Sequence, residues 1–205
     1  MDRRALYGIA GELQVLAYEA DISSLYESDL RAATRRNLQI HIAKRVIAEA
    51  QVKPASWKGV GGVDIAIKSA SGKGYDALLE LKLWKDKGKM DESVWDAWKL
   101  ASAYKESLAP HVYLVAAGGE SLWNSDSAML VYWGDEKVLA GDSWTSHQSA
   151  WKQYVSKKAG PMQLPAGLRG TPIGRVPIHS PEGEDWLLVC SKITTTPGPA
   201  FMPQP

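Results

Sequence analysis

The chain has 205 residues, a formal net charge of +1 at pH 7 and a single cysteine, Cys190. This length suits one domain with a small appended part, and one thiol excludes an intrachain disulfide and a thiolate metal cage. The near-zero charge excludes a globally basic nucleic-acid binder. Because the chain shows no apolar run typical of a signal peptide or a membrane span, a cytoplasmic protein with no membrane partner is expected.

The first part of the chain is predicted to be mainly helical. Residues 1–23 are expected to form an N-terminal arm or a short helix, and residues 24–50 a long helix. Ser24 with Glu27 three residues later is a capping-box pattern, which marks a helix start. An apolar stripe at helical spacing supports the long helix: Leu30, Ala33, Leu38, Ile42 and Val46. A short strand over residues 52–58 is expected to follow.

Residues 63–83 predict a β-hairpin with two different faces. Strict alternation gives one apolar face: Ile65, Ile67, Ala77, Leu79, Leu81 and Leu83. The other face carries charged side chains, including Asp64, Glu80 and Lys82. Cross-strand partners share a face, so the turn at residues 72–74 predicts Asp64 opposite Lys82 and Ala66 opposite Glu80. These charged residues are therefore expected to form one cluster.

The rest of the chain is predicted to extend this unit. Residues 85–90 are expected to form a polar loop, and Asp91 to cap a helix that ends near Leu108. A buried strand follows at residues 111–117, which completes a core over residues 24–118. Residues 119–193 are predicted as a β-rich C-terminal extension packed on that core. It is expected to contain a hairpin at 127–140, a helix at 149–158, a loop at 160–177, a strand at 186–193 pairing with 175–178, and then a disordered Pro-rich tail at 194–205.

The charged cluster has the composition of a metal-dependent phosphodiesterase site. Phosphodiester hydrolysis needs a hard cation, an activated water and relief of charge at the phosphate. Glu80 and Lys82 lie two residues apart on one strand and so share a face, while Asp64 supplies a second carboxylate from the neighbouring strand. Mg²⁺ keeps several waters when it binds, so two or three carboxylates are enough to hold it.

Two short motifs on these adjacent strands carry a family resemblance. They are Gly62-Val63-Asp64-Ile65-Ala66-Ile67 and Leu79-Glu80-Leu81-Lys82, with a helix before and a helix after them. This pattern resembles the PD-(D/E)xK nuclease superfamily, although Val63 replaces the proline. The resemblance implies an α/β protein with a restriction-endonuclease-like αβββαβ core, in which a mixed central sheet is flanked by helices.

The upstream helix adds a second part to the resemblance. The segment Tyr26-Glu-Ser-Asp-Leu-Arg-Ala-Ala-Thr-Arg-Arg-Asn-Leu38 is similar to a helix of the NucS/EndoMS-type endonucleases, and this similarity implies a site carboxylate at Glu27. That group usually has a glutamine in the helix after the lysine motif, where this chain has Lys99. Lys99 is a candidate replacement, and the dimerisation domain of that group is not represented.

The resemblance implies specific roles. Asp64, Glu80 and Glu27 are expected to bind Mg²⁺ or Mn²⁺, with Lys82 as the fourth catalytic residue that positions or activates water. Contacts to nucleic acid, with DNA favoured, are expected from a basic set: Arg31, Arg35, Lys85 and Lys99. Glu27 has a structural alternative as the partner of Ser24 in the capping box. Glu49, late on the same expected helix, is a weaker candidate.

Two other functions stay open at this point. The first is a non-catalytic module on the same fold that binds nucleic acid or a protein. The second is an α/β ligand-binding or structural protein in which Asp64 and Lys82 form only a cross-strand ion pair. The oligomeric state is also open, with a homodimer among the alternatives.

Overall fold

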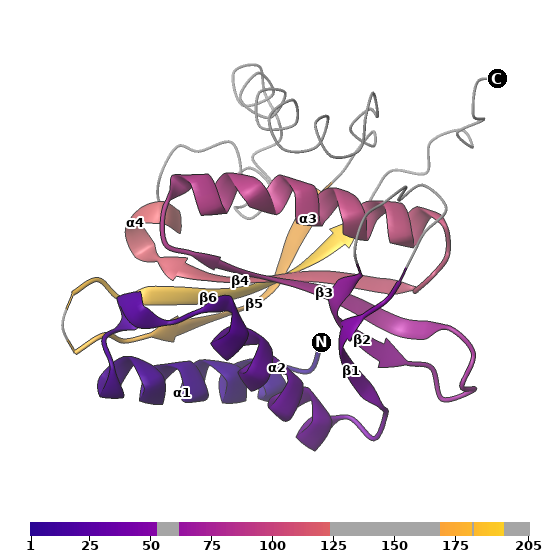
Figure 1. Cartoon of the computed structure of the whole chain (residues 1–205), viewed down its shortest axis with the longest axis horizontal. Coiled ribbons are helices and arrows are strands. Elements are labelled where there is room, and N and C mark those ends of the chain that lie inside the picture. Colours follow the sequence, from indigo (N-terminus) through magenta and orange to yellow (C-terminus); the bar gives the residue numbers. More distant parts are fainter. Residues whose placement is uncertain (53–61, 124–168, 182, 195–205) are drawn as a thin grey trace, which may run out of the picture.

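A six-stranded mixed sheet flanked by helices forms the centre of the protein (Figure 1). The computed structural model describes residues 1–52, 62–123, 169–181 and 183–194. The strands are β1 Val46–Ala50, β2 Val63–Lys68, β3 Tyr75–Trp84, β4 His111–Gly119, β5 Arg169–Ile178 and β6 Trp186–Thr194. The helices are α1 Arg3–Glu19, α2 Glu27–His41, α3 Lys87–Lys105 and α4 Glu120–Trp123, with a 3₁₀ turn at Ile22–Ser24. The strand order is β1-β2-β3-β4-β6-β5.

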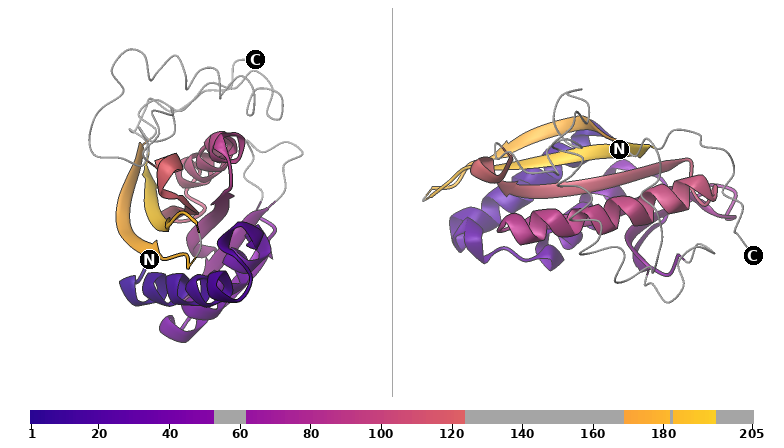
Figure 2. Two further views of the ribbon diagram at one scale, coloured as in Figure 1. Left: turned by 90° about the vertical axis from the view of Figure 1, so that its left-hand side faces the viewer. Right: turned by 90° about the horizontal axis from the view of Figure 1, so that it is seen from above.

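The sheet separates two hydrophobic cores. Helices α1 and α2 cover one face and α3 covers the other, as both views in Figure 2 show. The predicted apolar face of β3 packs toward α1 and α2 through Leu79 and Leu81. The other face of β3 packs toward α3 through Leu78 and Trp84. Because α3 also covers this second face, the charged residues of β3 are enclosed rather than exposed to solvent.

Helix α1 is longer than the arm or short helix that the sequence suggested. It spans 17 residues, and its N-cap Asp2 accepts a hydrogen bond from the Arg4 backbone N–H at 2.9 Å. Its buried residues recur at helical spacing along one side: Ala5, Leu6, Ile9, Ala10, Leu13 and Ala17. This stripe packs in the same core as α2, so α1 is an integral layer of the fold. None of the helices in the described ranges combines enough length and apolar character to cross a membrane.

The predicted helix over residues 24–50 is wrong at both ends. Helix α2 begins at Glu27, and the backbone N–H of its N-cap Tyr26 donates to the Asp29 carboxylate at 2.8 Å. Ser24 instead lies in the 3₁₀ turn, where its hydroxyl donates to the Asp21 carbonyl at 2.7 Å. Helix α2 ends at His41, and β1 takes up the last part of the expected helix. Tertiary pairing with β2 therefore overrides the helical spacing of Val46.

The first strand of the sheet, β1, lies earlier in the chain than predicted. A strand was expected at residues 52–58, of which 53–58 lie outside the described residues, whereas the strand before β2 is β1. Strands β1, β2 and β3 pair antiparallel, and β3 pairs parallel with β4. The order from α2 to β4 is thus α, β, β, β, α, β, as the sequence predicted.

The β2–β3 hairpin keeps the predicted faces but not the predicted register. Ile65 pairs with Leu79, and extension by one residue brings Asp64 opposite Glu80 rather than Lys82. The last pair before the turn is Lys68 with Tyr75, so the connection covers residues 69–74 instead of 72–74 and shifts the register by three residues. The bulge between Ile67 and Lys68 returns one of these residues, which leaves a net shift of two. Faces are preserved because the shift is two residues, which leaves the alternation of the side chains unchanged.

The later elements join the same sheet. Helix α3 starts at Lys87 because Asp86, not Asp91, is its N-cap and accepts from the Lys89 backbone N–H at 2.8 Å; the expected loop at 85–90 is therefore wrong. Strand β5 occupies part of the expected loop at 160–177, and its predicted pairing with β6 is confirmed. The hairpin at 127–140, the helix at 149–158 and residues 195–205 of the tail lie outside the described residues.

Candidate active site

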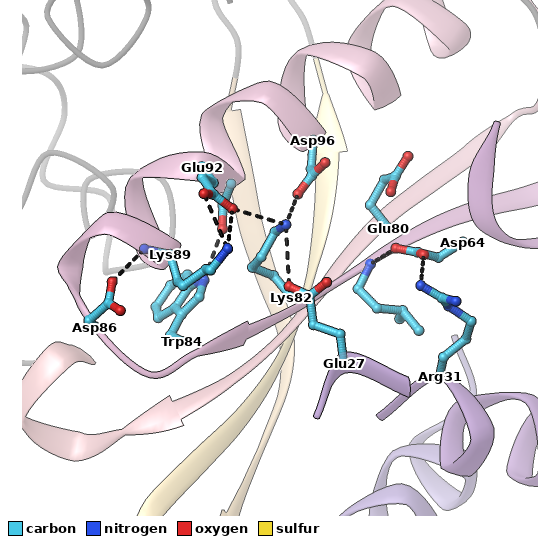
Figure 3. Close-up of polar contacts among 12 residues, drawn as sticks. Glu27, Arg31, Asp64, Glu80, Lys82, Trp84, Asp86, Lys89, Glu92 and Asp96 are labelled. Atoms are coloured by element: carbon cyan, nitrogen blue, oxygen red, sulfur yellow. Dashed lines mark hydrogen bonds and ion pairs between the residues drawn. The ribbon is translucent and has the colours of Figure 1, made fainter. Parts of the chain in front are cut away.

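The candidate site lies where β2 and β3 separate. Their described register ends at the Ile65–Leu79 pair, whereas β3 continues to Trp84 alongside β4. The Leu81 backbone N–H donates to the Asp64 Oδ2 carboxylate oxygen at 2.9 Å. The Asp64 side chain thus takes the place of a backbone acceptor on the neighbouring strand, so the Leu81 N–H group is not left unpaired. Where the two strands separate, Glu27 and Arg31 from the first turns of α2 reach this part of the sheet (Figure 3).

Arg31 of α2 links two carboxylates from neighbouring strands. Its NH2 atom lies 2.9 Å from Asp64 Oδ1, and its NH1 atom lies 2.6 Å from Glu49 Oε1. Glu49 is on β1, not late on a helix as expected, and its backbone has φ of +50°. A left-handed conformation at a residue other than glycine costs about 1–3 kcal/mol and is often found at functional sites. Asp64 therefore pairs with Arg31 and not with Lys82.

Lys82 is surrounded by carboxylates from two helices. Its Nζ atom lies 3.2 Å from Asp96 Oδ2, 3.4 Å from Glu27 Oε1 and 3.8 Å from Glu92 Oε2 (Figure 3). Burial alone would lower the pKa of Lys82, but the negative charges of Asp96, Glu27 and Glu92 outweigh burial and hold this pKa above its ordinary value. Lys82 is therefore a fixed positive charge at neutral pH.

Glu80 is enclosed under α3, with only 3% of its surface exposed. Lys99 Nζ lies 2.6 Å from Glu80 Oε1 and 3.3 Å from Asp96 Oδ1. Burial raises the pKa of Glu80 well above its ordinary value, and the charges of Asp96 and Asp64 raise it further, while Lys99 opposes them. The Glu80 carboxylate thus depends on a nearby positive charge to remain ionised.

The structure brings together most of the residues that the sequence singled out. Glu80, Lys82 and Glu27 lie in one connected ion-pair network, which Lys99 and Asp96 complete. Asp64 pairs separately with Arg31, and it lies near enough to this network to raise the pKa of Glu80. Of the expected phosphate contacts, Arg35 and Lys85 are exposed, whereas Lys99 is buried at the centre of the network.

Asp96 and Glu92 of α3 are the members that sequence analysis missed. Asp96 is only 5% exposed, yet it contacts both lysines of the network. One signal was present in the sequence: Asp96 precedes Lys99 by three residues and is flanked by Trp95 and Trp98 on a helix with apolar neighbours. Charged residues at helical spacing within an apolar stretch indicate a buried ion pair.

The donor chemistry suits a hard divalent cation, although the ligand set is small. Asp64 and Glu80 offer carboxylate oxygens, and Asp64 is near enough to raise the pKa of Glu80. Within the described ranges, no three His, Cys, Asp or Glu side chains gather as metal ligands, and Glu27 pairs with Lys82. Mg²⁺ can be held by two carboxylates together with bound waters, and Asp64 and Glu80 are the two candidates at this position.

Comparison with known proteins leaves this geometry as the basis for inferring function. No family model matches the chain, and neither a curated protein nor a solved structure matches it.

Proposed function

We propose that the protein is a metal-dependent nuclease with a restriction-endonuclease-like core, which hydrolyses phosphodiester bonds, preferably in DNA. The observation that carries this proposal is the arrangement of Asp64, Glu80 and Lys82 where β2 and β3 separate. Asp64 accepts from the backbone N–H of Leu81, which lies between the other two residues, and Glu80 and Lys82 are linked through Lys99 and Asp96. The order of elements from α2 to β4 supports it, as does the position of Glu27 at the start of α2, within contact of Lys82. Buried charged groups with shifted pKa values are typical of catalytic sites.

In this proposal, Asp64 and Glu80 hold Mg²⁺ or Mn²⁺. Such an ion, when bound, supplies an acidified water and charge relief at the phosphate. Burial and the neighbouring acids raise the pKa of Glu80, so its ionised form needs a nearby positive charge, which a bound ion would supply. Lys99 and Arg31 supply that positive charge in the present geometry, so both side chains are expected to loosen their contacts when an ion binds.

Lys82 acts as an electrostatic group rather than as a base. Because its pKa lies above the ordinary value, it carries no free lone pair to accept a proton at neutral pH. Its ammonium group can donate hydrogen bonds to the attacking water and offset charge on the phosphate. Glu27 and Asp96 hold that ammonium group in place, at 3.4 Å and 3.2 Å respectively.

The proposal is tested by incubating the purified protein with DNA and Mn²⁺. Wild-type protein is expected to cut single-stranded, duplex or branched DNA, and EDTA is expected to stop the reaction. Asp64→Asn should abolish cutting, because it removes one of the two expected metal ligands. Asp76→Asn is the matched control, because Asp76 is a carboxylate that pairs with Lys44, outside the ion-pair network of the site. If wild-type protein cuts none of these substrates, the enzymatic proposal is wrong.

A non-catalytic binding module on the same fold is the second candidate. The observation that favours it is that Lys99 and Arg31 already pair with Glu80 and Asp64, while no metal-ligand group of three acidic, His or Cys side chains occurs among the described residues. Calorimetry separates the two candidates. A nuclease should release or absorb heat on Mn²⁺ addition in a manner that depends on Asp64, whereas a module of this kind should show no such heat.

A further inference from the structure

An exposed aromatic ring lies at the rim of the candidate site. Tyr26 is the N-cap of α2 and has 66% of its surface exposed. The next residue, Glu27, contacts Lys82 through its carboxylate at 3.4 Å. The backbone therefore fixes the Tyr26 ring one residue away from the charged network, on a rigid helix start rather than on a long loop.

A lysine lies over the same ring. Lys85 Nζ is 4.9 Å from the centroid of the Tyr26 ring, within the range of a cation–π contact. Lys85 follows directly after β3, three residues beyond Lys82, and its side chain is exposed. Lys87 and Lys89 are also exposed at the start of α3, so positive side chains continue along the chain from Lys85. An aromatic ring beside lysines is the combination that proteins use to bind single-stranded nucleic acid.

We propose that Tyr26 and Lys85 form a nucleotide-binding rim, in which the ring stacks on an unpaired base of DNA and the lysine contacts an adjoining phosphate. This inference rests on the proposed function only for the cutting of the bound strand, and not for the binding itself. It specifies the substrate class as single-stranded or locally unpaired DNA, since the faces of paired bases inside a duplex are covered by their neighbours. Stacking tolerates any base sequence, so the rim selects for an unpaired strand rather than for a sequence.

The inference is tested by fluorescence anisotropy with a labelled oligonucleotide in EDTA, so that no cutting occurs during the measurement. Three probes are compared: a single strand, a duplex of equal length, and a single strand with abasic sites. Wild-type protein should bind the intact single strand most tightly. Tyr26→Ala should weaken that binding by about 5- to 100-fold and leave binding of the abasic strand unchanged.

Two matched variants separate stacking from general surface effects. Tyr26→Phe keeps the ring and should bind the single strand as wild type does. Tyr18→Ala removes a tyrosine of comparable exposure, 60%, from α1 and should have no effect. Lys85→Gln should weaken binding of all strands and lower the salt dependence by about one counterion.

The inference is overturned if Tyr26→Ala binds the intact strand like wild type, if wild type does not distinguish intact from abasic strands, or if it binds no single strand. Its failure is distinguishable from failure of the proposed function. If Tyr26→Ala binds and cuts DNA like wild type, the nuclease proposal is retained and the nucleotide-binding rim is contradicted. Strong Tyr26-dependent binding with no cutting in Mn²⁺ would support the rim and contradict the nuclease proposal.

Discussion

Replacement of Lys82 by glutamine is expected to reduce Mn²⁺-dependent DNA cleavage by about 10²- to 10³-fold. The Lys82 ammonium group is held by Asp96 and Glu27 at 3.2 Å and 3.4 Å, so it is already oriented before substrate binds. Loss of its charge removes stabilisation of the charge that develops on the phosphate in the transition state. The substitution should lower kcat and leave KM nearly unchanged, as measured by steady-state cleavage of a labelled strand.

The control for this prediction is a lysine of α3 itself, Lys89, which shares the partner Glu92 with Lys82. Lys89→Gln removes an exposed lysine that pairs with Glu92 at 3.1 Å, and it should change kcat by less than about twofold. Thermal melts of both variants show whether either loses its fold. A Lys82→Gln protein that melts cooperatively and still cleaves like wild type would remove Lys82 from the proposed mechanism.

Replacement of Asp96 by asparagine is expected to lower the free energy of unfolding by about 3–5 kcal/mol. Asp96 is only 5% exposed and contacts both Lys82 and Lys99. Its removal leaves these buried lysines with less opposing charge, and burial then favours their neutral forms. Urea unfolding followed by tryptophan fluorescence measures the change.

A second acid on α3 provides the comparison. The Glu92 side chain is 35% exposed and lies 3.8 Å from Lys82, so Glu92→Gln should cost less than about 1 kcal/mol. The pKa values of Lys82 and Lys99 are both raised, so their contribution to stability is fully present below about pH 10 and is lost only as the pH rises further. The part of the Asp96→Asn penalty that comes from the two lysines should therefore be constant across neutral pH. Equal effects of the two substitutions would contradict a network centred on Asp96.

The faces of the hairpin could be predicted from the sequence, whereas its register could not. Alternation of apolar residues such as Leu79 and Leu81 is a local property, so it identified which side chains of β2 and β3 share a face. The register that brings Asp64 next to Glu80 depends on a connection at residues 69–74 and on a bulge after Ile67, and no residue type in the turn specifies either of them. The predicted cluster was retained because a shift of two residues does not move a side chain to the other face.

The end of α2 and the lining of the site depend on tertiary packing. Val46 continues the helical spacing of Leu38 and Ile42, but pairing of β1 with β2 determines its conformation. Asp96 gains its role only when α3 packs over β3 and brings it to Lys82 and Lys99. Sequence alone therefore indicated the chemistry of the strands, while the countercharges supplied by the helices required the structure.

Anomalous X-ray scattering from crystals soaked in Mn²⁺ tests the central claim most directly. The nuclease proposal predicts an anomalous peak in contact with the carboxylates of Asp64 and Glu80, and loss of that peak in crystals of Asp64→Asn. A soaked crystal without a peak at these carboxylates, in which Lys99 still pairs with Glu80 and Arg31 still pairs with Asp64, would contradict a metal-dependent active site.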